Sequence, residues 1–201
     1  MDFHSQRTSI MVLQMRPHFI YNTMASIYCL CDQDPAQARQ VVLDFTTYLR
    51  KNLTAIASSD PIPFSSELEH TRAYLAVEQA RYEGRLFVEF NTPDTFFRVP
   101  PLTLQPIVEN AVKHGLDPEL EPLHVSVFTE STELGVRIIV EDNGPGYVPP
   151  ADDEAQFSLD NIRERLKTMC GGTLEIVPRE EGGTSVTVFI PSRLPATSTN
   201  K

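Results

Sequence analysis

Hydrophobic residues recur at helical intervals in the first part of the chain. One apolar stripe covers residues 10–31 and a second covers residues 41–56, with members three and four positions apart. Asp34 and Pro35 lie between the stripes and suit the cap and the first position of a second helix. The pattern predicts an antiparallel helical hairpin. Because each stripe is apolar on one side only, we expect the hairpin to pair with a second copy in a four-helix bundle.

The pattern changes after Pro61 and Pro63, because two prolines in three residues cannot continue a helix. Helical spacing returns in three later segments, and these alternate with short β-branched or aromatic runs bounded by turn residues. The expected helices are residues 67–83, 102–114 and 159–169, and the expected strands are residues 86–90, 124–129, 136–141, 173–177 and 185–190. We therefore predict an α+β fold in which a mixed sheet is covered on one face by helices.

The glycines divide the chain, since all nine lie at Gly84 or beyond. We predict a helical dimerisation segment over residues 1–60, an α/β domain over residues 61–194 and a flexible tail over residues 195–201.

Composition and charge limit the possible partners. The 201 residues include 17 Lys+Arg and 27 Asp+Glu, which gives a formal net charge of -10. No broad cationic face is left for nucleic acid or an anionic membrane surface. No apolar run approaches the roughly 20 residues that span a bilayer, and the first 15 residues lack the order of a signal peptide. We expect this chain to be cytoplasmic.

The cysteines and most histidines carry no metal-site pattern. Three cysteines cannot all pair, and free buried thiols are expected for Cys29, Cys31 and Cys170. Solvated positions are expected for three histidines that have no cysteine or carboxylate at ligand spacing, namely His4, His70 and His124. P-loop, Rossmann and hydrolase motifs are absent from the sequence.

A carboxylate followed by glycines comes directly after one predicted strand, over residues 142–146. Asp142 at the end of a strand can accept a hydrogen bond from an amine-bearing heterocycle, and Gly144 and Gly146 leave room for its ring. The same pentapeptide also suits an ordinary turn, which these residues taken alone favour. The pair Gly182 and Gly183 similarly suits a simple hairpin turn.

Polar residues share one face near the end of another predicted helix. Asn110, Lys113 and His114 lie three and four positions apart, and they suit a phosphate chain with its magnesium ion. A basic last turn that complements the helix dipole, capped by Gly115, explains them equally well.

His18 follows Pro17 on the first stripe, where the proline opens the helix backbone. A neutral imidazole is nucleophilic. Without further context, however, a histidine between Pro17 and Phe19 is more often a packed residue.

Taken together and in this order, the motifs resemble those of sensor histidine kinases of the LytS/YehU type. Residues 13–22 resemble the phosphoacceptor segment, residues 104–115 the N box and residues 142–146 the first glycine box. Further matches are Glu78, Arg81, Tyr82, residues 161–166, and Gly182 to Thr184. The likeness covers about residues 10–192.

The resemblance implies a dimerising hairpin followed by an ATP-binding GHKL domain, a two-layer α/β sandwich. In that family, the residue matching Asn110 holds Mg²⁺ and the residue matching Asp142 reads the adenine amino group. The resemblance places Gly144, Gly146, Ser158, Gly183 and Thr184 around the nucleotide, with Lys113 and His114 near its phosphates. The histidine matching His18 takes the γ-phosphoryl group and passes it to an aspartate of a response regulator. The chain would then be the cytoplasmic portion of a membrane-bound bacterial sensor whose sensor region is not in this sequence.

The second glycine box departs from the family. Gly-x-Gly-Leu is expected before the 161–166 motif, and Gln156 to Leu159 stand there instead. Backbone amides approach phosphates less closely without those glycines, although Ser158 can cap the helix and Gln156 can donate a hydrogen bond. The leading interpretation is ATP-dependent autophosphorylation and phosphorelay. The alternative is a catalytically impaired dimer that serves a response regulator as scaffold or phosphatase. A water-using ATPase is disfavoured because Pro106 occupies the position of its glutamate base.

Overall fold

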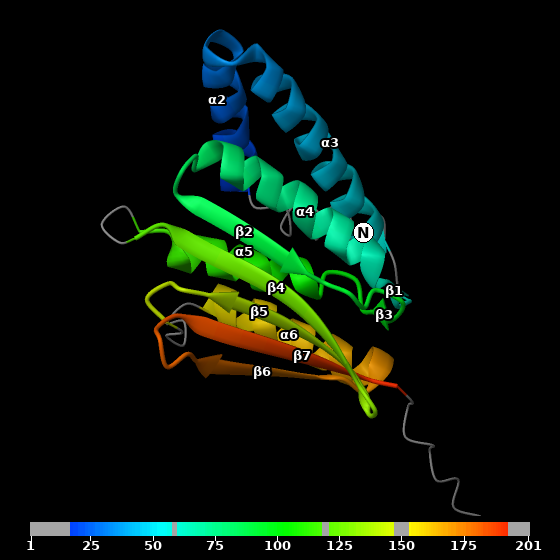
Figure 1. Ribbon diagram of the computed structural model, residues 1–201. Coiled ribbons are helices and arrows are strands. Elements are labelled where there is room, and N and C mark those ends of the chain that lie inside the picture. The colour runs from blue at the N-terminus through cyan, green and yellow to red at the C-terminus, as the bar shows by residue number, and fades with distance from the viewer. Residues whose placement is uncertain (1–16, 58–59, 118–120, 147–152, 193–201) are drawn as a thin grey trace, which may run out of the picture.

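The computed structural model describes residues 17–57, 60–117, 121–146 and 153–192, with the backbone alone for residues 17, 54–57 and 153–158. Helices α2 (Pro17–Gln33) and α3 (Pro35–Ala57) form the predicted hairpin (Figure 1). The carboxylate of Asp34 accepts hydrogen bonds from the amides of Ala36 and Gln37, both at 3.0 Å, and so caps α3. The predicted cap and the predicted first position of this helix are confirmed.

Helix α4 (Phe64–Arg81) lies between the hairpin and the rest of the molecule (Figure 1). It follows β1 (Ile62–Pro63), which pairs antiparallel with β3 (Arg98–Val99). The helix begins three residues earlier than the spacing predicts, directly after Pro63. The small β1–β3 sheet was not predicted, because two-residue strands carry no hydrophobic period.

Five strands form the main sheet, and each contains one of the predicted runs. They are β2 (Leu86–Asn91), β4 (Leu123–Thr132), β5 (Gly135–Asp142), β6 (Thr173–Pro178) and β7 (Thr184–Pro191). Their order is β2-β4-β5-β7-β6, with β2 and β4 parallel and every other pair antiparallel. The predicted mixed sheet is therefore confirmed.

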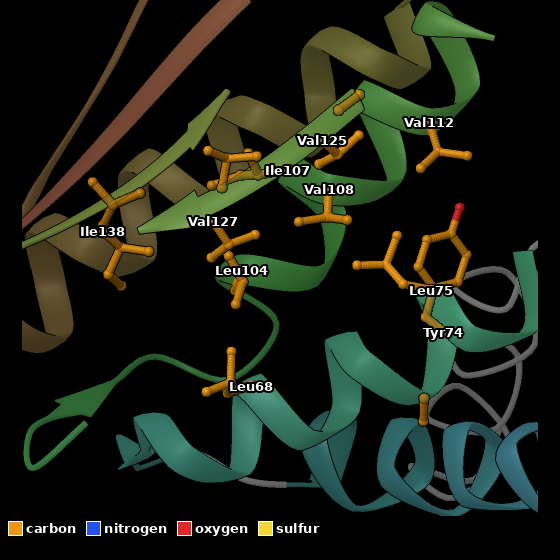
Figure 2. Close-up of a cluster of buried hydrophobic side chains, with 14 of the residues drawn as sticks. Leu68, Tyr74, Leu75, Leu104, Ile107, Val108, Val112, Val125, Val127 and Ile138 are labelled. Atoms are coloured by element: carbon orange, nitrogen blue, oxygen red, sulfur yellow. The ribbon is translucent and has the colours of Figure 1, made fainter. Parts of the chain in front are cut away.

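Helices α5 (Leu104–Gly115) and α6 (Asp153–Cys170) cover one face of this sheet (Figure 1). Figure 2 shows the core between α4, α5 and the strands, with side chains such as Leu68, Leu104 and Val125. Along β5, alternate residues Ile138, Val140 and Asp142 are buried. The strand period therefore places the Asp142 carboxylate on the face that the helices cover.

Two expectations about burial were wrong. His70 was expected in solvent, yet only 2% of it is exposed, because α4 is covered by the hairpin as well as by the sandwich. The three cysteines are free, as expected, but Cys29 and Cys31 are exposed and Cys170 is half-buried. A helix that packs through one side only leaves its other residues in solvent.

Candidate functional site

Asp142 is the last residue of β5, and one of its carboxylate oxygens is held in place by backbone amides. Oδ1 accepts hydrogen bonds from the N–H groups of Gly144, at 2.9 Å, and Thr184, at 3.3 Å. No donor among the described residues reaches Oδ2. A carboxylate fixed through one oxygen can offer the other to a hydrogen-bond donor of a ligand, such as an amino group.

Burial raises the pKa of Asp142 above its usual range. The Gly144 and Thr184 amides and the charge of Arg179 partly offset this effect. Arg179 also donates a hydrogen bond to the backbone oxygen of Asp142, at 3.0 Å, and lies 3.6 Å from the carboxylate of Glu141. Sequence reasoning missed Arg179, because it lies in the β6–β7 turn, 37 positions along the chain, and no local pattern links it to Asp142.

Close backbone packing explains the glycine at position 183. Gly183 has a φ of +91°, and a Cβ there would overlap the backbone oxygen of Asp142. A Cβ on Gly146 would lie 3.7 Å from the oxygen of Gly183. The structure therefore brings together Asp142, Gly146, Gly183 and Thr184.

The loop after Asp142 lies against the C-terminal end of α5. A Cβ added to Gly144 would lie 2.8 Å from the Cα of Gly115, so only glycine fits at this crossing. The side chain of Asn143 holds the loop from the other side, accepting from the N–H of His124 at 2.7 Å and donating to the oxygen of Pro122 at 3.2 Å. The helix that carries Asn110 is thus packed, at its C-terminal end, against the loop that follows Asp142.

The predicted polar face of α5 is found near that helix end. Asn110 is half-buried, while Lys113 and His114 are exposed in the last turn. Nowhere in the described parts of the chain do three or more His, Cys, Asp or Glu side chains gather in a group that could hold a metal ion. A single amide oxygen suits Mg²⁺ that is held mainly by phosphates and water, because this ion takes few protein ligands.

Two predicted residues fall where side chains are not described. Ser158 and Gln156 belong to the first turns of α6, but their side chains lie outside the described residues. Contact between Ser158 and a phosphate stays a prediction.

His18 lies on the exposed side of α2, so its interpretation as a packed residue is wrong. The amide nitrogen of Asn22, one turn later, lies 3.1 Å from each of its ring nitrogens. The neighbouring Phe19 is buried instead, with its ring centroid 4.9 Å from that of Tyr48 and 5.2 Å from that of Tyr74. This packing leaves the imidazole accessible, on a different element from the residues around Asp142 (Figure 1).

Known proteins resemble this chain along most of its length. The family model described as "Histidine kinase" matches residues 7–86, and the model "Histidine kinase-, DNA gyrase B-, and HSP90-like ATPase" matches residues 101–194. YwpD of Bacillus subtilis (strain 168) is 37% identical over 186 residues, which cover 88% of this chain and 67% of that protein. The sensor protein LytS of the same organism is 33% identical over 193 residues, covering 89% of this chain and 32% of LytS.

A solved structure extends the likeness to the fold. The histidine kinase AdeS of Acinetobacter baumannii superposes with a TM-score of 0.51 at 16% identity, covering 95% of this chain and 98% of that one. This chain spans about two thirds of YwpD and about one third of LytS. The two family models together match residues 7–86 and 101–194, and YwpD and LytS are 37% and 33% identical to this chain, so the chain belongs to the histidine kinase family.

Proposed function

We propose that this chain is an ATP-dependent protein-histidine kinase of two-component signalling. It binds ATP between α5 and the loop after Asp142, and it transfers the γ-phosphoryl group to His18. The phosphoryl group then passes from His18 to an aspartate of a response regulator. The observation that carries the proposal is Asp142, whose Oδ1 accepts from two amides while no donor among the described residues reaches Oδ2. The match of residues 101–194 to a family of ATPase domains supports the use of ATP.

We assign each of these residues a role toward ATP from its position in the fold. Oδ2 of Asp142 accepts a hydrogen bond from the adenine amino group, with Gly144, Gly146, Gly183 and Thr184 around the base. The Asn110 side-chain oxygen binds Mg²⁺ that arrives with the phosphates, and this ion neutralises phosphate charge. Lys113, His114 and Ser158 lie nearer the phosphates. Together these residues orient the triphosphate, which matters because phosphoryl transfer needs positioning more than covalent help.

The transfer step forms one bond and breaks one. The lone pair of a His18 ring nitrogen attacks the γ-phosphorus, while the bond from phosphorus to the β–γ bridging oxygen breaks and ADP leaves with that electron pair. The ring then loses its proton to water, which leaves a phosphoramidate. Exposure of the imidazole on α2 supports this role, because a buried ring could not meet a nucleotide.

The hairpin supports the homodimer. Large apolar side chains on α2 and α3 are exposed, with Tyr28 at 78% and Leu43 at 62%. We propose that these exposed apolar side chains pack against a second copy of the hairpin. We propose a dimerisation and phosphoacceptor segment over residues 1–60, an ATP-binding domain over residues 61–194 and a flexible tail over residues 195–201.

The chain's place in a longer sensor is also a proposal. Within the described part of the chain, every helix is too short or too polar to span a bilayer. The relative LytS is about three times as long as the region it shares with this chain. We propose that the chain acts as the cytoplasmic portion of a membrane-bound sensor.

The test is incubation with γ-labelled ATP and Mg²⁺. Wild type should gain acid-labile, base-stable label, and His18→Ala should gain none. Asp142→Asn should also lose the label, because Asn keeps an oxygen for Gly144 and Thr184 but places an NH₂ group where the adenine amino group needs an acceptor. Asp160→Asn, an exposed change on α6, is the matched control and should be labelled like wild type.

Label that persists in His18→Ala would place the phosphoacceptor elsewhere. Nucleotide binding without any label on wild type would instead support the scaffold or phosphatase alternative, which the present comparisons do not favour.

A further inference from the structure

The turn before α5 is held by a side chain from a distant helix. Glu67 of α4 is completely buried, and its carboxylate accepts three backbone hydrogen bonds. The donors are the N–H groups of Leu102 at 2.7 Å, Thr103 at 3.0 Å and Leu104 at 3.0 Å. The amides of Thr103 and Leu104 are among those that the start of a helix leaves without internal partners, so Glu67 caps α5 from outside.

A second side chain holds the opposite edge of the same turn. Arg165 of α6 donates hydrogen bonds to the backbone oxygens of Pro101, at 2.7 Å, and Leu102, at 2.9 Å. Leu102 has a φ of +55°, a left-handed conformation that is uncommon for leucine. The turn is therefore bound through its amides by α4 and through its carbonyl groups by α6.

The segment before α5 does not supply this cap. Thr103, the residue before the helix, makes no side-chain cap, and its hydroxyl donates to the oxygen of Pro100 at 2.6 Å. Burial raises the pKa of Glu67, while the three amides and the charge of Arg165 act in the other direction and favour the ionised form. The position of the first turn of α5 is thus set by α4 and α6.

The other end of α5 has little freedom to adapt. Gly115 packs against Gly144 so closely that a Cβ on Gly144 would lie 2.8 Å from the Cα of Gly115. Sliding an α-helix by one residue moves every side chain by about 1.5 Å and turns it by about 100°. A displacement at Leu104 would therefore change where Asn110 points.

We propose that Glu67 and Arg165 are positioning residues of the kinase reaction, which hold α5 in the register that aims Asn110 at the magnesium ion of bound ATP. This inference rests on the proposed function. Neither side chain touches the nucleotide in this proposal, because both act through the backbone of residues 101–104.

The experiment compares Glu67→Gln and Arg165→Gln with matched controls on the same helices. Gln at position 67 keeps one acceptor but turns an NH₂ group toward the remaining amide donors. The controls are Glu69→Gln, an exposed residue of α4 that pairs with Lys51, and Arg163→Gln, an exposed residue of α6 that pairs with Asp160. Dissociation constants for ATP are measured on the full chain, well below the melting temperature, once with Mg²⁺ and once with EDTA.

Mg²⁺ should strengthen ATP binding by wild type and both controls. In Glu67→Gln and Arg165→Gln this strengthening should fall about tenfold or more, because a shift of about 1 Å in a positioned group has large effects. Affinity in EDTA, which depends on the Asp142 end of the site, should stay within about twofold of wild type. A general loss of folding would lower both affinities together. An unchanged magnesium effect, or an equal loss in both media, would overturn the proposal.

Amide hydrogen exchange provides a second measurement that needs no nucleotide. Exchange at residues 109–115, away from the altered contacts, should accelerate about tenfold in both variants relative to their controls, because the helix register is released. Acceleration confined to residues 102–104 would contradict the proposal. If wild type binds no ATP at all, the proposed function fails, and this exchange pattern still decides whether Glu67 and Arg165 hold α5.

Discussion

Helix α4 is packed on two sides, and the two sides are built differently. Toward the sandwich it presents Leu68 and Leu75, which join the core shown in Figure 2, together with the Glu67 carboxylate that binds three amides. The Glu67 carboxylate binds the backbone of residues 102–104, at the start of α5, and lies near the charge of Arg165. This side combines apolar packing with a carboxylate whose two oxygens both accept hydrogen bonds.

Toward the hairpin, α4 presents His70 and Tyr74 to an aromatic group from α2 and α3. The ring of His70 lies 5.5 Å from that of Tyr48, and Tyr74 lies 5.2 Å from Phe19. Among the described residues, no hydrogen-bond partner reaches the buried Nε2 of His70 or the buried Nδ2 of Asn52 on α3, and the same is true of Oε1 of Gln105 on α5, in the sandwich. An unpaired buried polar atom costs about 1–3 kcal/mol. On its two sides, α4 itself presents a paired carboxylate to the sandwich and a ring nitrogen without a described partner to the hairpin, so we expect the hairpin to be held less firmly than the sandwich.

The largest effect on stability is expected from truncating a core side chain on the sandwich side of α4. Leu75→Ala should lower the free energy of unfolding by about 3 kcal/mol, because it leaves a cavity where the side chain is 1% exposed. Leu134→Ala, at a position between β4 and β5 that is 77% exposed, should change it by less than about 0.5 kcal/mol. Urea denaturation measures both, and equal effects would remove the contrast.

The pH dependence tests the hairpin side. Burial, followed by the charge of Lys51, lowers the pKa of His70 from 6.5 to about 4. Between these two pH values His70 is therefore protonated in the unfolded chain and neutral in the folded chain. The stability due to neutral His70 is full above pH 6.5 and is lost as the pH falls toward 4.

Between pH 7 and pH 5 this loss should reach roughly 2 kcal/mol. His70→Gln, which cannot titrate, should show a correspondingly shallower decline in chemical denaturation at each pH. Parallel curves for wild type and variant would show that His70 titrates as an ordinary exposed histidine.

A smaller, local effect is expected at the hairpin. Phe19→Leu removes the ring contacts to Tyr48 and Tyr74, which contribute about 1 kcal/mol beyond buried area. Hydrogen exchange should become faster in α2 while β4 and β5 stay as protected as in wild type. Asp32→Asn, at an exposed polar position of the same helix, should leave α2 unchanged. Faster exchange in the strands would mean that hairpin and sandwich open together.

The smallest effect is expected from the ion pair between α3 and α4. Lys51 and Glu69 lie 2.5 Å apart on the surface, with side chains 32% and 68% exposed. Lys51→Gln should lower stability by less than about 0.5 kcal/mol, and the difference should shrink at high salt. The variant should also raise the pKa of His70, because that charge lowers it. A stability loss independent of salt would point to packing of the lysine stem instead.

Regular elements were predictable because each carries its own period. The two stripes predicted α2 and α3, Asp34 and Pro35 predicted their junction, and all five long strands contain their predicted runs. The position of Asp142 at the end of β5 was equally local. Contacts without a sequence pattern were missed. Arg179 reaches Asp142, and Glu67 reaches Leu102, across more than thirty positions.

The sequence by itself determined where helices and strands form and which residue types could meet a nucleotide, since hydrophobic period, turn chemistry and motif order are local properties of the chain. Only the tertiary structure decided that Gly144 lies against Gly115, that His70 is buried and that α5 is capped by Glu67. These features depend on which faces of distant elements meet. That outcome follows from packing all elements around one core, and no single segment encodes it.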